Sequence, residues 1–352
     1  MTTMTHFIFG RYAPGGGTLG GSAGQLVPGA GTGHSASVED ALVAKAHAAG
    51  VKALAMIGGT GDGPGWALST TSSVRATFIN NILDKCVAKD YDGVDIDWED
   101  SLSTTTQQGQ LISFLGELRA AAAARPRYQA PNAPFLITFP GYWVNVNTDL
   151  PVPSWKVTVA SKVDQYNLMT YGQNFYAPGW DTWLFSPLKG SGPTHPTSVE
   201  SSVQAYVDAG VPRTRLGLGI GLFGKYYYPP VSGPRQKQSG GGGGDDNFDN
   251  YKNFAKKGLF DNPSGTYVWD DAAQAGYYVF SPPVTYQKAA WAKTETIGML
   301  TAEEARGIAA KGAWARAGNC GGAIVWAINY GYLGPPAGNP PMDAVKRAFL
   351  TP

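Results

Sequence analysis

Residues 91–100 read YDGVDIDWED, and this stretch decides the fold that we expect. Successive side chains of a strand point to opposite faces, so the acidic residues at positions 95, 97 and 99 share one face and the apolar residues between them share the other. The apolar face suits packing against covering helices, which turns the acidic face towards a shared interior or its mouth. Carboxylates this close cannot all ionise, so at least one pKa among Asp95, Asp97 and Glu99 is expected to rise, and we assign the proton to Glu99. Trp98 is expected to pack rather than to bind a ligand.

An alternating acidic row is by itself typical of a solvated edge strand or of a loop, because charged residues are mostly found at surfaces. Here, however, helix-like segments flank the row at Val74–Val87 and Gln107–Ala123. The row is therefore interpreted as the strand of a β/α unit whose C-terminal end carries Glu99. Asp92 is interpreted as a residue that shapes the entry to this strand.

The whole chain alternates strand-like and helix-like segments, which predicts parallel β/α units in a single catalytic domain over residues 1–352. Besides the acidic row, six segments are strand-like, namely Thr5–Gly10, Val51–Ile57, Phe135–Phe139, Val163–Tyr171, Leu216–Leu222 and Gly321–Ile328. A closed α/β barrel of the TIM type requires eight strands, so seven are recognisable and one is missing or disguised. Residues 225–286 form a long irregular insertion after the seventh barrel position, expected to be a reduced subdomain or a loop.

Composition limits the classes of ligand. The net charge is +1, only 15% of the residues are charged, and no Lys/Arg cluster occurs, which argues against nucleic acid and against an anionic membrane surface. Aromatic residues reach 12%, with 10 Trp and 18 Tyr, which suits stacking on sugar rings as well as ordinary core packing. Cys86 and Cys320 form no disulfide framework, and the four histidines are scattered, so we expect neither a metal nor a cofactor.

One motif points elsewhere and is rejected. Residues 219–224 read GIGLFG, which matches the dinucleotide pattern G-x-G-x-x-G after a strand. The next residues are KYYYPP, so no helix begins there to receive a pyrophosphate.

Taken together, these residues resemble the glycoside hydrolase family 18 chitinases. The family signature Asp-x-x-Asp-x-Asp-x-Glu is met at Asp92, Asp95, Asp97 and Glu99. Further similarities follow in the family's order, at residues 5–7, 58–59, 169–171 and 321–326. The resemblance covers nearly the whole chain and is weak only near residues 225–276, where many members insert a small α+β domain. It implies a (β/α)8 barrel and no cofactor.

The resemblance also implies a mechanism in which the substrate's own 2-acetamido group attacks the anomeric carbon. Glu99 would protonate the glycosidic oxygen and later activate water, while Asp97 would orient the acetamido N–H and Asp95 would share a proton with Asp97. Tyr171 would donate to the acetamido oxygen. The residues expected to line the substrate site are Trp326 as the floor of a sugar ring, Met169, Tyr142, Trp143, Gly58 and Gly59. Taken alone, Trp326 would more often be a core tryptophan than a residue of a binding site.

Three departures from the family pattern bear on activity. Met56 stands where many members have Ser, so Asp95 is expected to lose a hydroxyl partner. Gly172 follows Tyr171 where members usually have Asp, which removes a carboxylate near Glu99 and predicts a shifted pH optimum. The first β/α element of the family is not recognisable. We therefore expect weakened activity and possible oligomers through exposed strand edges.

The leading prediction is an endo-acting chitinase that hydrolyses β-1,4-linked N-acetylglucosamine polymers, with chitin or chito-oligosaccharides as partners. One alternative is an endo-β-N-acetylglucosaminidase acting on N-glycans, which shares the acidic motif. The other is a catalytically weak chitin-binding lectin. Because the family acts mostly outside the cell, a secreted protein is expected.

Overall fold

The computed structural model describes residues 2–29, 35–100, 102–174, 177–238, 241–288 and 294–351. The chain divides into two compact units. The first consists of residues 1–141 and 153–167, and the second of residues 142–152 and 168–352. Each is described by itself.

The first unit is built on parallel strands that hydrogen-bond in the order β5, β4, β3, β1. A short strand, β2, pairs antiparallel with the outer side of β1. The bounds of these strands are β1 His6–Pro14, β2 Leu26–Pro28, β3 Lys52–Gly58, β4 Gly93–Asp97 and β5 Leu136–Tyr142. The acidic row thus lies on an inner strand, as the sequence predicts.

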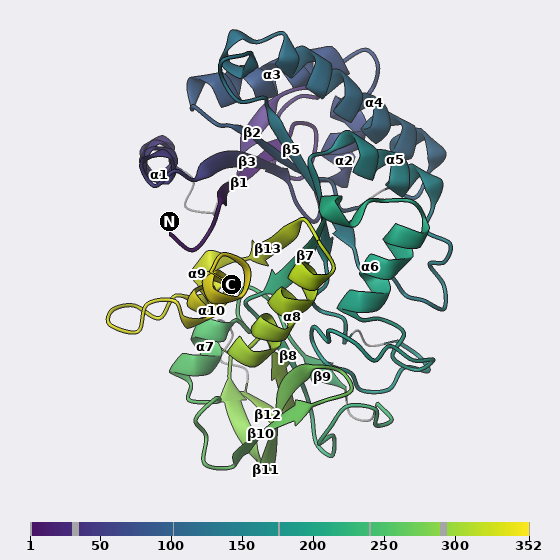
Figure 1. Ribbon diagram of the computed structural model, residues 1–352, viewed down its shortest axis with the longest axis vertical. Coiled ribbons are helices and arrows are strands. Elements are labelled where there is room, and N and C mark those ends of the chain that lie inside the picture. The colour runs from purple at the N-terminus through teal and green to yellow at the C-terminus, as the bar shows by residue number, and fades with distance from the viewer. Residues whose placement is uncertain are drawn as a thin grey trace. The chain divides into compact units, whose positions relative to one another are not determined.

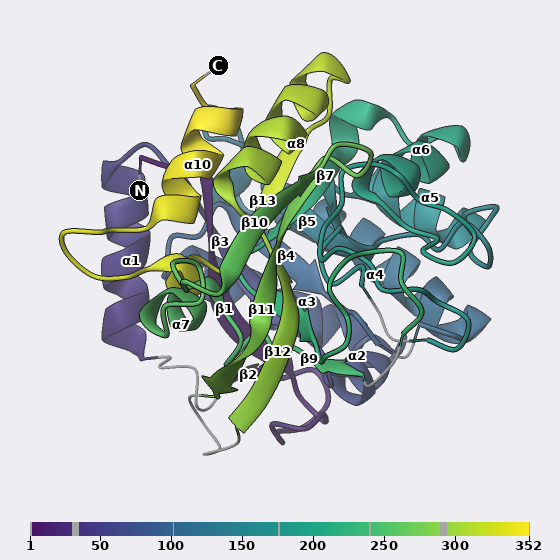
Figure 2. The same cartoon turned by 90° about the horizontal axis from the view of Figure 1, so that it is seen from below.

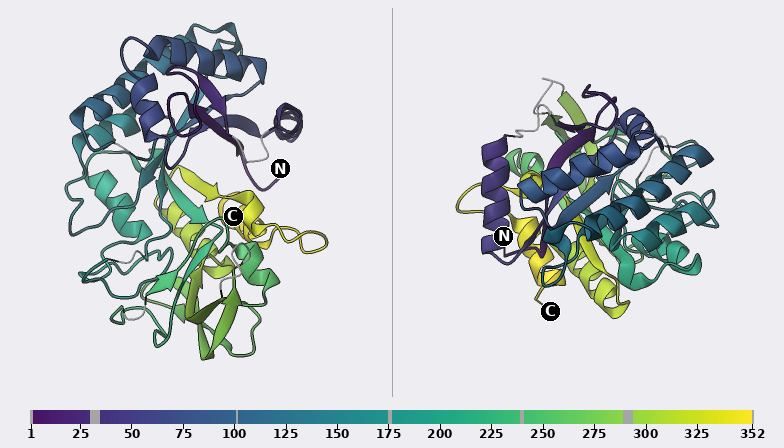
Figure 3. Two further views of the ribbon diagram at one scale, coloured as in Figure 1. Left: turned by 180° about the vertical axis from the view of Figure 1, so that it is seen from behind. Right: turned by 90° about the horizontal axis from the view of Figure 1, so that it is seen from above.

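Helices alternate with these strands along the chain, which makes the unit α/β. They are α1 Ala36–Ala48, α2 Gly63–Ser69, α3 Arg75–Ala88, α4 Thr105–Ala123, the 3-10 turn η1 Pro126–Tyr128 and α5 Ser154–Lys162. Helices α3, α4 and α5 lie side by side in a row (Figures 1 and 3). Thr104 begins α4 with a capping box, since its hydroxyl accepts from the backbone N–H of Gln107.

The apolar face of β4 packs under these helices. Trp98 is 1% exposed, and its ring stacks on Trp66 of α2 at 5.3 Å between ring centroids. Phe78 of α3 and Phe114 of α4 meet Trp66 edge-on at 5.7 and 5.6 Å. This aromatic cluster confirms the predicted packing role of Trp98, and it fixes the acidic residues of β4 on the opposite face.

Close contact between β4 and β5 makes one glycine indispensable. A Cβ on Gly93 would lie 2.1 Å from the carbonyl oxygen of Leu136, a backbone atom that cannot move aside. We expect Gly93→Ala to lower the free energy of unfolding by about 2 kcal/mol or more, the scale of strain from overpacking. In contrast, a Cβ on Gly109, exposed on α4, meets nothing within 4 Å. Gly109→Ala should raise stability by about 1 kcal/mol. Urea denaturation of both variants checks this, and equal effects would contradict it.

The second unit contains the end of β6 (Gln165–Met169), followed in hydrogen-bonding order by β7 (Leu216–Gly221) and β13 (Gly322–Trp326). Its remaining helical elements are α6 Val199–Asp208, η2 Arg213–Arg215, α7 Tyr251–Lys256, α8 Ala305–Ala317, α9 Ile328–Gly331 and α10 Pro340–Phe349. Helices α8 and α10 pack against one another (Figure 2). A Cβ on Gly312 would lie 2.5 Å from the carbonyl oxygen of Ala348, so glycine permits this contact.

The described part of residues 225–286 is not the irregular loop that was one expectation, because most of it forms a sheet, in line with the other expectation of a reduced subdomain. Its strands hydrogen-bond in the order β10, β11, β12, β8, β9, with antiparallel pairing throughout (Figure 1). Their bounds are β8 Gly224–Tyr227, β9 Gly242–Gly243, β10 Gly265–Asp270, β11 Ala275–Gln287 and β12 Thr294–Ala302. The sheet has its own core, in which Phe254 and Tyr286 contact each other. We refer to it as the insertion sheet.

All seven strands predicted from the sequence are present among the described residues, as β1, β3, β4, β5, β6, β7 and β13. Each lies within a few residues of its predicted position. The absence of a first β/α element, and the single domain, stay predictions.

Candidate active site

The acidic side chains of the first unit are positioned by the neighbours of β4. In the sheet register Asp95 lies between Met56 of β3 and Thr138 of β5, and Asp97 lies opposite Gly58. Asp95 and Asp97 are almost fully buried, whereas Glu99 follows the strand and is partly exposed. The strand therefore places two carboxyl groups in a dry interior and a third at its edge.

Asp95 has a hydroxyl partner after all. Met56 of β3 supplies no hydroxyl, as expected, but the Thr138 hydroxyl donates to Asp95 Oδ1 from the other neighbouring strand. Burial raises the pKa of Asp95 to about 6; the Thr138 hydrogen bond opposes this rise and the charge of Glu99 adds to it. The sequence could not show this, since it does not reveal which residue of β5 faces Asp95.

The pKa of Asp97 is raised further than that of Asp95. Burial, followed by the charges of Glu99 and Asp95, raises its pKa well above the usual range, while Arg11 opposes the rise. Its Oδ1 is buried and accepts no hydrogen bond from any described residue. Since buried polar atoms are normally paired, this oxygen is free for a donor from outside the protein.

Glu99 contacts the loop that follows β3. The Thr60 hydroxyl donates to Glu99 Oε1 at 3.0 Å. The charge of Glu99 contributes to the raised pKa of both Asp95 and Asp97. The assignment of the proton to Glu99 stays a prediction.

The predicted glycines have a structural task at this loop. The backbone N–H of Gly59 donates to the carbonyl oxygen of Asp97 at 2.8 Å. A Cβ on Gly58 would lie 2.2 Å from that same oxygen, and both glycines have positive φ, at 96° and 138°. They permit the close approach of the loop to Asp97, and substrate contact by them stays a prediction.

An ion pair between Arg11 and Asp62, which was not predicted from the sequence, stabilises the same loop. Arg11 of β1 donates to the carbonyl oxygen of Gly58 at 3.1 Å and to the Asp62 carboxylate. Asp62 is fully buried; burial raises its pKa although Arg11 and Thr18 oppose the rise. No local pattern marks the pair, because its members are 51 positions apart.

Asp92 plays the structural part predicted for it. It accepts hydrogen bonds from the backbone N–H of Ala53 at 2.9 Å and from Lys52 at 3.0 Å, and His47 lies 2.9 Å from it. Burial alone would raise its pKa, yet these partners hold the pKa below its usual value. Asp92 thus ties the entry of β4 to β3 and α1.

The raised pKa values predict how stability depends on pH. Above pH 4 the native state holds protons on Asp95 and Asp97 that the unfolded state has released, so these groups make the free energy of unfolding fall as pH rises. For Asp95 the fall runs from about pH 4 to about pH 6 and amounts to roughly 3 kcal/mol. A double variant, Asp95→Asn with Asp97→Asn, should lose this fall, as measured by urea denaturation at pH 4, 5, 6 and 7. The exposed Asp343→Asn is the control, and parallel pH profiles for wild type and the double variant would contradict the expectation.

The second unit holds the other predicted residues. Tyr171 follows β6, and its ring packs edge-on against Phe223 at 5.5 Å between centroids. Met169 ends β6 and is 9% exposed. Tyr142 is 45% exposed, and the ring of the half-buried Trp143 lies 6.2 Å from that of Trp180.

Trp326 ends β13 and is oriented by an aspartate that the sequence analysis did not single out. Its indole Nε1 donates to Asp246 Oδ2 at 2.8 Å, and the Tyr330 hydroxyl lies 3.4 Å from the same oxygen. A satisfied indole with partial exposure suits a platform better than a core tryptophan. Whether these residues meet the acidic row in one site stays a prediction.

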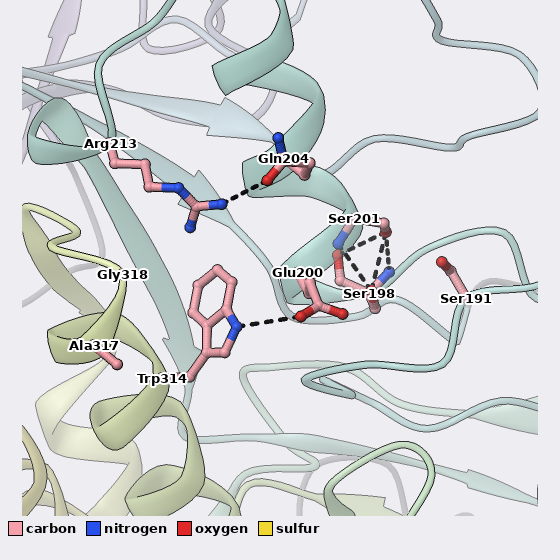
Figure 4. A pocket seen from close by; sticks show the side chains of 9 residues that line it. All are labelled: Ser191, Ser198, Glu200, Ser201, Gln204, Arg213, Trp314, Ala317 and Gly318. Carbon is pink, nitrogen blue, oxygen red and sulfur yellow. Dashed lines mark hydrogen bonds between the residues drawn. The ribbon is translucent and has the colours of Figure 1, made fainter.

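A cavity of about 450 Å³ also lies in the second unit, between α6 and α8 (Figure 4). Its polar side chains are largely paired with one another. Arg213 donates to Gln204 at 2.6 Å, and the Trp314 indole N–H donates to Glu200 at 3.3 Å (Figure 4). Most polar groups that line the cavity therefore bond to one another across its walls, and they are not directed at a ligand.

Among the residues that the structure describes, no group of three or more His, Cys, Asp or Glu side chains could hold a metal ion. No helix there is long and apolar enough to cross a membrane.

Comparisons with solved structures support the fold. A chitinase-like agglutinin from Robinia pseudoacacia is similar over 99% of this chain and 94% of its own, with a TM-score of 0.74 and 20% identity. A mutant of the class V chitinase from Nicotiana tobaccum in complex with NAG4 is similar over 99% and 93%, with a TM-score of 0.73 and 18% identity. A family 18 N-acetylglucosaminidase from Paenibacillus barengoltzii matches over 99% and 94%, at TM-score 0.73 and 18% identity.

Sequence comparison shows the family. Chitinase 1 of Aphanocladium album is 24% identical over 66% of this chain and 58% of its own length. A class V chitinase of Arabidopsis thaliana is 29% identical over 52% and 50%. The chain thus spans about half the length of the curated relatives that it matches. The family model for glycosyl hydrolases family 18 matches residues 21–331, and the chain therefore belongs to that family, with class V chitinases among its homologues.

Proposed function

We propose that the protein is an endo-acting chitinase that cleaves β-1,4-linked N-acetylglucosamine polymers by a retaining, substrate-assisted mechanism. The observation that carries this proposal is the Asp97 carboxyl group. It is buried, it is flanked by Asp95 and Glu99, and its Oδ1 has no hydrogen-bond partner among the described residues. An acetamido N–H is a donor of the kind that this oxygen lacks.

In the proposed reaction Glu99 is the general acid. The acetamido oxygen attacks the anomeric carbon and the glycosidic bond breaks, while Glu99 gives its proton to the leaving oxygen. The Asp97 carboxylate accepts the acetamido N–H and stabilises the positive charge of the oxazolinium ion. To be an anion at that moment it passes its proton to Asp95, whose pKa is raised to about 6. Water then attacks the anomeric carbon while Glu99 removes its proton, and the bond between the anomeric carbon and the acetamido oxygen breaks. This regenerates the acetamido group and the acid form of Glu99, and the proton on Asp95 returns to Asp97.

The family pattern supports two further residues, Tyr171 and Trp326, as the groups that hold the sugar. The Tyr171 hydroxyl donates to the acetamido oxygen, and the Trp326 indole, oriented by Asp246, forms the floor under the ring. Relatives support the choice of substrate, since the tobacco enzyme was solved with NAG4 and a family 18 chitinase from Cycas revoluta with (GlcNAc)3. We further propose that the protein is secreted.

Three tetrasaccharides test the proposal. The fully N-acetylated chitin tetramer should be cleaved, whereas its deacetylated form and cellotetraose should not, because neither carries the acetamido nucleophile. Product analysis by mass spectrometry measures this directly. Cleavage of all three would exclude assistance by the substrate.

Two other activities are distinguished by the same assay. Cleavage of an N-glycan core in preference to the chitin tetramer would indicate an endo-β-N-acetylglucosaminidase. Tight binding of the tetramer without cleavage would indicate a lectin, an outcome favoured by the similarity to the Robinia pseudoacacia agglutinin.

A further inference from the structure

Two consecutive residues, Phe185 and Ser186, form hydrogen bonds with the backbone on both sides of Tyr171. Before Tyr171, the Ser186 hydroxyl donates to the carbonyl oxygen of Thr170 at 2.5 Å. After it, the backbone N–H of Gln173 donates to the carbonyl oxygen of Phe185 at 2.9 Å. Any movement of the pair 185–186 therefore moves the backbone of Tyr171.

Phe185 also supports the aromatic ring of Tyr171, through Phe223. Phe185 packs edge-on against Phe223 at 4.7 Å between ring centroids, and Phe223 packs edge-on against Tyr171 at 5.5 Å. Glycine makes room for this row of rings, since a Cβ on Gly221 would lie 3.0 Å or less from atoms of all three. The ring of Tyr171 and the backbone on either side of it therefore both depend on the residue pair 185–186, which we call the support of Tyr171.

The support is in turn fixed by the end of β12 in the insertion sheet and by α8. The backbone N–H of Phe185 donates to the Thr301 hydroxyl at 2.9 Å. The Ser186 hydroxyl accepts from Lys311 Nζ at 2.7 Å, and the same ammonium group donates to Glu303. Lys311 and Glu303 are 1% and 3% exposed, so this pair is buried.

The ammonium group of Lys311 limits which hydrogen bonds the Ser186 hydroxyl can donate and accept. An ammonium group can only donate, so the Ser186 hydroxyl accepts from Lys311 and keeps its single proton for an acceptor such as the Thr170 carbonyl oxygen. A buried ion pair contributes little net stability compared with an apolar pair of similar volume. The ion pair does, however, orient the Ser186 hydroxyl, and an apolar pair could not do so.

We propose that Glu303, Lys311 and Ser186 are positioning residues that hold the Tyr171 hydroxyl in place for the reacting acetamido group. The catalytic purpose of this role rests on the proposed function. The placement of Tyr171 by these residues does not depend on it. This arrangement also gives the insertion sheet a role, because Thr301 of β12 and Glu303, which directly follows β12, hold the residue pair 185–186 that supports Tyr171.

The test uses Ser186→Ala, because Lys311→Met would leave the buried Glu303 without its partner and endanger the fold. The matched control is Ser69→Ala in the first unit. Ser69 is likewise buried, accepts one hydrogen bond, from Gly24, and donates one, to Gly15. Loss of hydrogen bonding alone should therefore affect both variants alike.

The first readout is the fluorine NMR spectrum of protein labelled with 3-fluorotyrosine. Tyr171→Phe identifies the Tyr171 resonance among those of the 18 tyrosines. We expect that resonance to shift or broaden in Ser186→Ala and to stay in place in Ser69→Ala. An unchanged Tyr171 resonance in Ser186→Ala would overturn the proposal, whether or not the protein hydrolyses chitin.

The second readout is a double-mutant cycle on chitin tetramer hydrolysis. Ser186→Ala should lower kcat by about tenfold to a hundredfold, the scale of a misplaced catalytic contact, with a smaller change in KM. In the Tyr171→Phe background the same substitution should change kcat less than about twofold. Equal losses in both backgrounds would contradict positioning of Tyr171. Absence of hydrolysis by the wild type would refute the proposed function and leave the NMR readout to decide the positioning.

Discussion

The Glu99→Gln variant is expected to lose hydrolysis of the chitin tetramer, with kcat lower by about 10³-fold. Gln keeps the size of Glu99 and can keep its contact with Thr60, but it has no proton to give to the leaving oxygen. Because the substitution leaves the binding surface in place, the affinity for the tetramer should change little. Initial rates from product chromatography and affinities from calorimetry measure the two quantities separately.

Glu117→Gln provides the control for Glu99. Glu117 is a surface carboxylate that pairs with Arg75 at 2.6 Å, and its replacement should leave kcat within about twofold of the wild type. Activity in Glu99→Gln above one tenth of the wild-type value would mean that another group protonates the leaving oxygen.

Asp97→Asn is expected to produce the second large effect, a fall in kcat of about 10²-fold to 10³-fold. Asn has the shape of Asp, but its side chain cannot become an anion opposite the oxazolinium charge. Stability should move in the other direction. Burial and the neighbouring carboxylates raise the pKa of Asp97, so a neutral amide should fold at least as well at neutral pH. Steady-state kinetics and thermal unfolding at pH 7 together measure the effect.

The matched control is Asp92→Asn, at the other end of β4. Asp92 is held in its charged form by Ala53, His47 and Lys52, so this variant should lose stability and keep kcat within about twofold. The pair of variants thus separates a chemical role from a structural one. A stability loss in Asp97→Asn as large as that in Asp92→Asn would contradict the assigned roles.

The sequence was sufficient for the strands that carry chemistry. The alternation of β4 predicted the buried face of Trp98 and the shared wall of Asp95 and Asp97, because strand periodicity is a local property. The seven predicted strands follow from equally local patterns of apolar runs followed by helices.

The insertion sheet was missed because its pattern is weaker. Strand β11 contains two consecutive prolines, Pro282 and Pro283, which argue against a strand, and its register with β12 shifts between Val279 and Val284. Its core combines two tyrosines with Phe, Leu, Val and Ile side chains from three strands and from the region of α7, so no clean alternation marks it.

The partners of the candidate site were hidden for a different reason. Thr138 reaches Asp95 and Arg11 reaches Asp62 across 43 and 51 positions, and Asp246 reaches Trp326 across 80. Such contacts depend on the register of neighbouring strands and on loop paths. The sequence therefore predicted the acids of the family signature, but not the residues that tune and orient them.

The most direct test of the account is the anomeric form of the first product released from the chitin tetramer, read by proton NMR before mutarotation. Attack by the substrate's acetamido group followed by water retains configuration, so the account predicts the β-anomer from the wild type and no product from Glu99→Gln. Fresh α-anomer from the wild type would contradict the account, and so would a bound tetramer that is never cleaved.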